Sequence, residues 1–556
     1  MTIVQSPQSW IKHTFFIGII AALTACGGSG GGGKEPPIAP PDTTPNAFTI
    51  PAEQEVEPGE EVISEAVTIN GINRAAPISI VGGEYSINSA AYTSAEGTIN
   101  NNQSITVKVL APEANNETAE ATLTIGGVSA IFSIATIIDN TPPSVTITFP
   151  PAVSLTEGTT ILVRGTASDE LNAVESVEVG GFPATSEDGF ATWVAEVTLE
   201  PGVENVLNVT ARDSVGSEGD NLASVTVRHS ADLNIAFPDD QVQFSAPQTV
   251  AVDAERNQAL VVDVEDRAIY AVDLATGVRR ILSENKEGDE YPLLLERTDF
   301  NYAGIAVDSE NDVAYVGSST EDVFTSGPTV LSVNLETGVR DAVSMSLTTR
   351  VSQLAFNTDD DRIYLGSFFD GLFTAVDPVA KEDEVVSWSE LNVPADGENP
   401  LTSVGAVAID NARNRALVTT AIDEQLVMAI DLSEENLGVR TPFSTASIPN
   451  TDNLFTASGD HVLTSITIDA ANDRALMVDR GLNAIFSLAL EDGARTILSD
   501  ADSPNSLNTL LDPTSVYLEE GMTYGLVVDK ERKALMAIDL VNGQRVVLSK
   551  SAVSLP

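Results

Sequence analysis

Short apolar runs, each ending in an acidic or amide residue, recur from about residue 240 onward at intervals of roughly fifty residues. The six copies are TVAVD (249–253), GIAVD (304–308), QLAFN (353–357), AVAID (406–410), SITID (465–469) and SVYLE (515–519). Three further apolar runs follow each copy, and in the first repeat these are ALVVD, AIYAVDL and VRRILS. Such runs between polar turns predict β-strands, and four strands in about fifty residues are typical of a propeller blade.

A solenoid would show the same repetition, but its end repeats would be atypical capping units. The first and last repeats here keep the apolar runs of the others, which favours a closed ring. We therefore expect a six-bladed β-propeller over 233–556, and the repeat resembles the NHL, YVTN and gluconolactonase-like propellers. How the ring closes stays open, with 234–244 as a candidate closing segment. An arginine recurs at the start of the fourth strand, where we expect it to pair with a neighbouring carboxylate: Arg279, Arg340, Arg440, Arg495 and Arg545.

Upstream of the repeats, apolar and polar residues alternate in short runs separated by Gly and Asn, as in ISIVGG, SITVKVL and ATLTIGG. This alternation predicts an antiparallel β-sandwich over 46–138. Residues 139–232 contain DNTPPSVTITFP, VRGTASDE, DGFATWVAEVTL and NVLNVTARDSVGSEG, and they resemble bacterial Ig-like modules such as domain B of glucodextranase. Ser217 stands where that family usually has Asn, and Trp193 is expected in the core. The fold class is thus all-β, with two β-sandwich domains followed by a six-bladed β-propeller.

The first residues of the chain have a different pattern: Lys12 and His13 precede TFFIGIIAALTA, an apolar run of about a dozen residues. Such a run is too short to span a bilayer and suits a signal peptide. It ends in LTAC, which resembles the bacterial lipoprotein signal. The resemblance implies removal of 1–25, acylation (palmitate included) of Cys26, and anchoring in the cell envelope, most simply the outer membrane of a Gram-negative bacterium. The Gly- and Pro-rich residues 26–45 would then form a tether.

The formal net charge of −53 limits the class of partner. With 28 basic against 81 acidic residues, binding to nucleic acid or to an anionic bilayer through a basic face is not expected. An acidic surface suits divalent cations, basic partners or simple solubility. The single cysteine precludes an intrachain disulfide, and three histidines leave few ways to build a catalytic triad or a multi-histidine metal site.

Four carboxylates of the second sandwich are expected at one end of it. In an Ig topology the first strand begins at the end that carries the B–C and F–G loops. Asp139 opens the first strand, Asp169 and Glu170 lie in the B–C turn, and Asp213 begins the F–G turn. Ca²⁺ takes six to eight oxygen ligands, and four carboxylates at one end of the sandwich would supply several of them. We therefore expect a Ca²⁺ site at the junction with the preceding sandwich, where the ion would stiffen the connection between the two domains. The alternative is that these residues only form turns.

In a propeller, the turns between the second and third strands share one face with the connections from each fourth strand to the next blade. The long insertions fall on that face, at 284–302, 317–329, 389–403, 445–463 and 500–513. Asp263, Asp479 and Asp529 end second strands at equivalent positions and are candidate Ca²⁺ ligands at the channel mouth.

We expect a binding or scaffold module that contacts an envelope protein or glycan through this long-loop face. Candidate apolar anchors are Tyr291, Phe368 and Phe369, although the phenylalanines would also suit the core of a blade. The alternative is a Ca²⁺-dependent hydrolase or lyase for a lactone or glycan, because gluconolactonase-like propellers hold a metal at the channel. No complete ligand-and-base set matches that family, and no P-loop, dinucleotide fingerprint or nucleophile elbow is present, so no catalytic residue is assigned.

Overall fold

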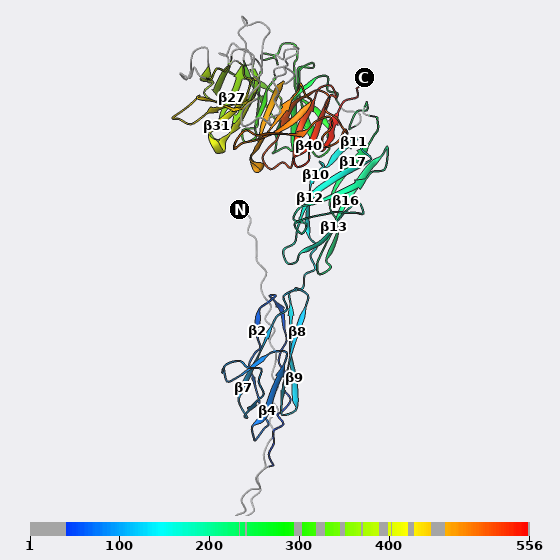
Figure 1. Ribbon diagram of the computed structural model, residues 1–556, viewed down its shortest axis with the longest axis vertical. Coiled ribbons are helices and arrows are strands. Elements are labelled where there is room, and N and C mark those ends of the chain that lie inside the picture. Colours follow the sequence, from blue (N-terminus) through cyan, green and yellow to red (C-terminus); the bar gives the residue numbers. More distant parts are fainter. Residues whose placement is uncertain are drawn as a thin grey trace, which may run out of the picture. The chain divides into compact units, whose positions relative to one another are not determined.

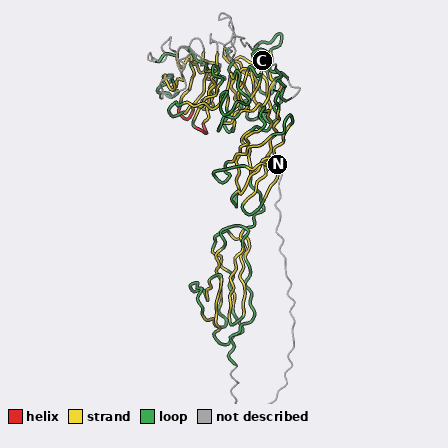
Figure 2. Tube along the Cα trace, turned by 45° about the vertical axis from the view of Figure 1, so that its right-hand side comes forward, coloured by secondary structure: helices red, strands yellow, loops and turns green. Residues whose placement is uncertain are grey.

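The computed structural model describes residues 40–232, 234–238, 242–293, 303–317, 329–344, 351–367, 371–388, 399–401, 403–420, 427–445 and 462–553. Strands make up nearly all of its regular structure, and the expected all-β class is confirmed (Figure 1, Figure 2). The chain divides into two compact units. The first comprises Met1–Glu113 and Glu117–Thr136, and the second comprises Ala114–Asn116 and Ile137–Pro556.

The first unit is a two-sheet sandwich. One sheet has the order β1-β9-β8-β4-β6, and in the other β2, β3 and β5 all pair with β7. Alternate side chains of β7, from Ile105 to Val109, point into the core, as the period-two pattern predicts. The strands are β1 (Glu53–Val56), β2 (Glu61–Ile63), β3 (Val67–Thr68), β4 (Ala76–Val81), β5 (Glu84–Ile87), β6 (Gly97–Ile99), β7 (Ser104–Leu110), β8 (Thr118–Ile125) and β9 (Val128–Thr136).

Residues 139–232, called the Ig-like module here after the resemblance in their sequence, also pack two sheets, β10-β12-β15 against β14-β13-β16-β17-β11. Trp193 is buried in the core between them, as expected. Gly165 makes room for the indole, because a Cβ at this position would lie 2.1 Å from Cζ2 of Trp193. The strands are β10 (Ser144–Phe149), β11 (Val153–Thr156), β12 (Thr160–Ser168), β13 (Val174–Val179), β14 (Phe182–Pro183), β15 (Trp193–Thr198), β16 (Glu204–Asp213) and β17 (Glu218–His229).

The remainder forms six four-stranded antiparallel sheets, each built from consecutive strands. The blades are β18 (Pro247–Asp253), β19 (Gln258–Asp263), β20 (Ala268–Asp273) and β21 (Arg279–Glu284); β22 (Ile305–Asp308), β23 (Val313–Gly317), β24 (Val330–Asn334) and β25 (Arg340–Ser344); β26 (Val351–Asn357), β27 (Arg362–Ser367), β28 (Leu372–Asp377) and β29 (Glu382–Trp388); β30 (Ala406–Asp410), β31 (Arg415–Thr419), β32 (Val427–Asp431) and β33 (Arg440–Ser444); β34 (Leu463–Asp469), β35 (Arg474–Asp479), β36 (Ala484–Ala489) and β37 (Arg495–Ser499); β38 (Pro513–Tyr517), β39 (Tyr524–Asp529), β40 (Ala534–Asp539) and β41 (Arg545–Lys550). Short 3-10 helices η1 (Asn411–Arg413) and η2 (Ala470–Asn472) follow β30 and β34.

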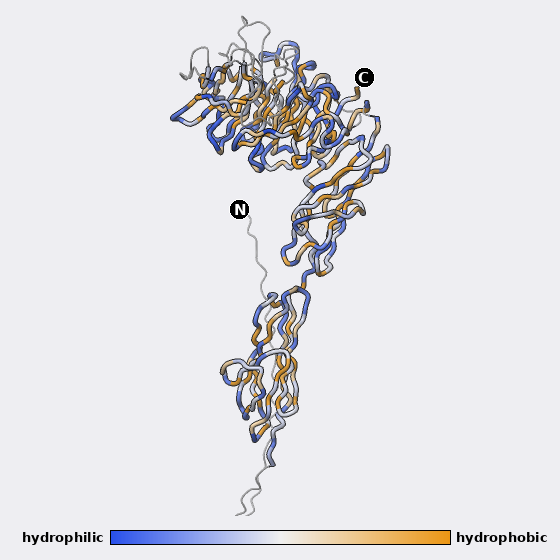
Figure 3. Tube along the Cα trace, viewed as in Figure 1, coloured by the Kyte–Doolittle hydropathy of each residue, from blue (hydrophilic) through white to orange (hydrophobic). Residues whose placement is uncertain are grey.

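The strands of the blades are apolar along their whole length because neighbouring blades cover both of their faces. All residues of β19 are buried, and the apolar clusters mix residues of adjacent blades. Apolar colouring accordingly follows the strands, while the turns at their ends are polar (Figure 3). This burial explains why the repeat reads as continuous apolar runs rather than as an alternation.

Adjacent blades are joined by a recurring clasp of serine, glycine and arginine. A serine near the end of one outer strand donates to the hairpin glycine carbonyl of the next blade and accepts a hydrogen bond from the arginine that opens that blade's outer strand. Between the first and second blades, Ser283 Oγ lies 2.8 Å from the Gly338 carbonyl and 2.8 Å from an Arg340 nitrogen. Gly338 has φ 71°, and a Cβ on it would lie 1.9 Å from the Leu282 carbonyl oxygen, so only glycine fits.

The clasp recurs at five of the six junctions. The other four sets are Ser387–Gly438–Arg440, Ser444–Gly493–Arg495, Ser499–Gly543–Arg545 and Ser549–Gly277–Arg279. The partner that these arginines share is therefore a serine hydroxyl and not the expected carboxylate, although Arg340 also pairs with Asp289. The arginine position of the third blade is held by Asp383, which is hydrogen-bonded to Ser344.

The sixth and first blades contact each other through β38 and β18, and each described blade keeps its own four consecutive strands. The last clasp, from Ser549 to Arg279, spans this junction. The backbone of Phe237 also exchanges two hydrogen bonds with that of Lys550, at 2.9 and 2.7 Å. The described part of 234–244 therefore pairs with the end of β41, and this answers the question that the sequence left open.

The Ig-like module and the sixth blade share a sheet. β11 pairs in parallel with β17 and touches β41 through Leu155 and Val547, which gives the order β14-β13-β16-β17-β11-β41-β40-β39-β38 (Figure 1). One apolar cluster contains Val227 of the module together with Ala537 and Val546 of the blade. The sequence suggested a domain boundary at residue 232. In the structure, the segments before and after this residue belong to one compact unit.

Candidate functional site

Three aspartates of the Ig-like module come together. Asp139 precedes β10, Asp169 follows β12, and Asp213 ends β16. One carboxylate oxygen from each lies within 4.8 Å of the others, and we call this group the aspartate cluster. Asp139 and Asp213 are buried and Asp169 is half-buried. The fold of this sandwich thus brings together three segments that are far apart in sequence.

One oxygen of each carboxylate is held by its own turn. Asp169 Oδ1 accepts from the Leu171 and Asn172 amides, and Asp213 Oδ1 accepts from three successive amides, 215–217, at 2.7–2.9 Å. Asp139 Oδ1 accepts from the amide and hydroxyl of Thr141, and these bonds lower the pKa of Asp139 below its usual value. The carboxylates are thereby held in fixed orientations.

Sequence reasoning missed the neutral residues around the cluster. Asn172 Nδ2 donates to Asp139 Oδ2 at 2.5 Å, and Asn115 Nδ2 donates to the Leu171 carbonyl at 2.8 Å. Asn116 exchanges two hydrogen bonds with the backbone of Asp139. Ser217, at the position where the Ig-like family has Asn, donates to the Asp139 carbonyl. A polar pair at 115–116, ahead of β8, was the available signal, but nothing in the sequence indicates that it lies against residue 139.

Glu170, the fourth predicted ligand, is not part of the cluster. It is exposed, whereas the carboxylate of the preceding Asp169 turns inward to cap the amides that follow it. The cluster therefore contains three of the four predicted carboxylates.

The three propeller aspartates predicted at the channel mouth do not meet. Each is fully buried, and among the described residues the aspartate cluster is the one group of three or more potential metal-ligating side chains. Asp263 accepts four backbone hydrogen bonds, from the amides of 245, 246, 265 and 266. Asp529 likewise binds the amides of 511, 512 and 532, and Asp479 those of 462 and 482. Each carboxylate thus links the segment that precedes the first strand of its blade to the turn that follows the second strand. These three aspartates therefore do not form the shared metal site that a hydrolase at the channel mouth would require.

The central channel holds a described cavity. This cavity, of about 190 Å³, is lined by the innermost strands of all six blades. Gln353 of the third blade reaches across it to Ser465 of the fifth, with Nε2 3.1 Å from Oγ. A second hollow, of about 550 Å³, lies among the turns 411–413, 470–473 and 519–522. Burial raises the pKa of Glu519 at its edge, and Tyr517 donates to that carboxylate at 2.7 Å.

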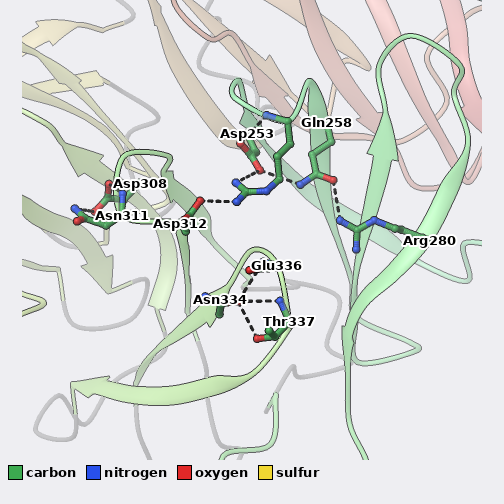
Figure 4. Close-up of polar contacts among 10 residues, drawn as sticks. Asp253, Gln258, Arg280, Asp308, Asn311, Asp312, Asn334, Glu336 and Thr337 are labelled. Carbon is green, nitrogen blue, oxygen red and sulfur yellow. Dashed lines mark hydrogen bonds and ion pairs between the residues drawn. The ribbon is translucent and has the colours of Figure 1, made fainter. Parts of the chain in front are cut away.

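The two faces of the propeller differ in the length of their connections. Between first and second strands, and between third and fourth strands, the longest connection is 432–439. On the opposite, long-loop face, three connections are much longer: 285–304, 389–405 and 445–462. The short turns are stabilised by their own side chains: Asn334 caps the hairpin at 336–337, and Gln258 links Asp253 to Arg280 (Figure 4). Ion pairs also link these turns between blades, Arg256 with Asp312 and Arg413 with Asp473.

The predicted apolar anchors are only partly described. Tyr291 is half-buried and lines a pocket of about 410 Å³ between the outer strands of the first two blades. Its carbonyl accepts from Arg340, and the nearby charge of Glu290 raises its pKa. Phe368, Phe369 and Cys26 lie outside the described residues, and so do most residues of the long insertions. Within the described chain, no helix is long and apolar enough to cross a bilayer.

No family model matches the chain, and no curated protein matches its sequence. Among solved structures, an auxiliary nutrient binding protein from Bacteroides thetaiotaomicron is 12% identical with a TM-score of 0.42, and the match covers 73% of this chain and 98% of that one. A nidogen/laminin complex gives 12% identity and a TM-score of 0.37 over 54% of this chain and 89% of that one. A gluconolactonase from Xanthomonas campestris gives 10% and 0.37 over 52% and 84%. Similarities this distant carry no argument about what this chain binds.

Proposed function

We propose that this chain is a lipid-anchored cell-envelope protein that binds a protein or glycan through the long-loop face of its propeller. The observation that carries the proposal is the unequal length of the connections on the two faces, with 285–304, 389–405 and 445–462 all on one side. Loops on a rigid scaffold carry binding residues more often than the scaffold does. Recognition is therefore assigned to this face.

The scaffold itself leaves few side chains for recognition. The repeated serines and arginines hold neighbouring blades together, and Asp263, Asp479 and Asp529 bind backbone amides. Residues that recur at equivalent positions have the same structural role in each blade that carries them. Residues that distinguish one ligand from another are expected where the blades differ, which is in the long connections.

The test is affinity capture from an envelope extract with the soluble chain from residue 27 onward as bait. One variant has 285–304 and 445–462 shortened, and the matched control has Met522→Arg in the hollow of the short-turn face. We expect a partner that the wild type and the control retain and the loop variant loses by at least about tenfold. Loss in the control alone would move recognition to the short-turn face, and an unchanged partner set in the loop variant would refute the proposal.

The anchor is tested separately in the intact precursor. Cys26→Ser removes the thiol that would accept the lipid, and two or more acyl chains are needed for stable anchoring. We expect the wild-type chain in the membrane fraction and the variant in the soluble fraction. Equal partitioning of the two chains would overturn lipid anchoring. The binding face is decided independently by the capture experiment.

A further inference from the structure

We propose that the aspartate cluster is a Ca²⁺ site. Asp139, Asp169 and Asp213 each offer an oxygen within 4.8 Å of the other two. Ca²⁺ binds oxygen at about 2.3–2.6 Å, so two ligands on one ion lie at most about 5 Å apart. The spacing of the three oxygens therefore matches a single ion. This inference concerns the second unit alone and is independent of the proposed binding face.

The negative charge of the cluster is not balanced by the described chain. None of the three carboxylates forms an ion pair with a described lysine or arginine. Their side-chain donors among the described residues are Asn172 and Thr141, both neutral and both directed at Asp139. Carboxylates gathered at this distance repel one another unless a cation lies between them.

Two buried oxygens beside the cluster provide independent support. Asp213 is 0% exposed, and its Oδ2 has no hydrogen-bond partner among the described residues. Asn115 is 5% exposed, and its Oδ1 also has none. Burying such an acceptor without a partner is unfavourable, and it is therefore rare in folded proteins. Asn115 belongs to this site because its amide nitrogen lies 3.4 Å from Asn172 Oδ1, and Asn172 in turn contacts Asp139. A cation bound among the three carboxylates would satisfy the oxygen of Asp213.

The donor set favours Ca²⁺ over other metals. All of its atoms are carboxylate or amide oxygens, whereas zinc and copper sites use His and Cys. Mg²⁺ requires near-ideal octahedral geometry and keeps much of its water, which suits a small set of ligands on exposed carboxylates. Here the carboxylates come from three separate turns and Asp213 is buried, and the larger, less directional Ca²⁺ tolerates such an arrangement.

The experiment is calorimetric titration of CaCl₂ into the soluble chain from residue 27 onward, freed of metal and in 150 mM NaCl to screen diffuse binding by the acidic surface. The whole chain is used because the Ig-like module shares its core with the sixth blade. We expect one saturable site with a Kd of about 10⁻⁴–10⁻³ M, and binding of MgCl₂ at least about tenfold weaker.

The variants assign the site. Asp213→Asn is expected to weaken Ca²⁺ binding at least about tenfold. Asp169→Asn should weaken binding by the same factor. Because Asp169 is half-buried, this variant is expected to fold even if Asp213→Asn does not, and circular dichroism checks the folding of both. Absence of a saturable site in the wild type up to 10 mM, or wild-type affinity in a folded Asp169→Asn chain, would overturn the proposal. Mg²⁺ binding as tight as Ca²⁺ binding would overturn the choice of metal.

Discussion

Two sets of three aspartates, one in the Ig-like module and one in the propeller, differ in what surrounds their carboxylates. Asp263, Asp479 and Asp529 occupy the same position in three blades, and each accepts hydrogen bonds from the amides of its own blade. The aspartate cluster draws one residue from each of three separate turns, and these residues face one another. Repetition around a ring places equivalent side chains far from one another, whereas the sandwich brings three turns of unrelated sequence together. Equivalence in sequence is therefore poor evidence for a shared site.

Removing a propeller aspartate gives the largest expected effect. Asp263→Ala leaves four partly buried backbone amides without their acceptor. At about 1–3 kcal/mol for each group that stays unsatisfied, partly relieved by water, we expect a loss of about 3 kcal/mol in the free energy of unfolding. The loss is measured by urea denaturation and should be the same with Ca²⁺ and with chelator. Glu287→Ala, an exposed residue of the same blade's outgoing loop, is the control and should change little. A Ca²⁺-dependent loss would make Asp263 a ligand after all.

Calcium should raise the free energy of unfolding through the aspartate cluster, and this gain should not depend on the propeller aspartates. At 10 mM Ca²⁺ and a Kd near 10⁻⁴ M, the gain is about 2.7 kcal/mol. Trp193 reports it: in the chain from residue 27 onward, Trp388→Phe leaves Trp193 as the one tryptophan. Its fluorescence should follow a transition that Ca²⁺ shifts to higher urea concentration. Asp213→Asn in the same background should abolish the shift, and persistence of the shift would place the ion elsewhere.

Acid should affect Asp139 and two of the propeller aspartates, Asp263 and Asp529, in opposite directions. The pKa of Asp139 lies below its usual 3.8 because Thr141 donates to it, so its stabilising contribution is complete above 3.8 and is lost as pH falls through the lower folded value. Burial raises the pKa of Asp263 and Asp529 above 3.8, so their ionisation costs stability as pH rises from 3.8 through the raised value.

Urea denaturation in chelator at pH 5, 4 and 3 measures these contributions by difference. The advantage of the wild type over Asp139→Asn should shrink as the pH falls, while its advantage over Asp263→Asn should grow. A change in the same direction for both variants would mean that the two environments do not differ as described.

The blades could be predicted from the sequence because each strand must be apolar to pack between the neighbouring blades. Every repeat therefore shows the same apolar runs. It did not predict the union of the Ig-like module with the sixth blade, since the contact of Leu155 with Val547 joins residues that carry no local signal of one another. The expected partner of Arg279 and Arg545 was wrong for a related reason. A serine on the adjacent blade is near only after the ring forms.

The aspartate cluster was three-quarters predictable. A known topology fixes which ends of strands meet, so Asp139, Asp169 and Asp213 could be placed together from their positions alone. Side-chain direction within a turn is set by hydrogen bonds that topology does not specify, and this excluded Glu170. Asn115 was missed because it lies ahead of β8, in a segment outside the Ig-like motifs, and only its contacts with Leu171 and Asn172 reveal its place.

Glu170→Gln should produce the smallest change of all and tests this distinction within one turn. The substitution removes one negative charge next to Asp169 without changing the size of the side chain. Because Glu170 is exposed, solvent and salt screen its interaction with the cluster, and we expect Ca²⁺ affinity within about twofold of the wild type and stability within about 0.5 kcal/mol. Asp169→Asn, one residue earlier and with the same loss of charge, should weaken binding at least about tenfold. If the two variants weaken binding equally, the acidic turn acts through its net charge alone, and the fixed geometry of the cluster is not what binds the ion.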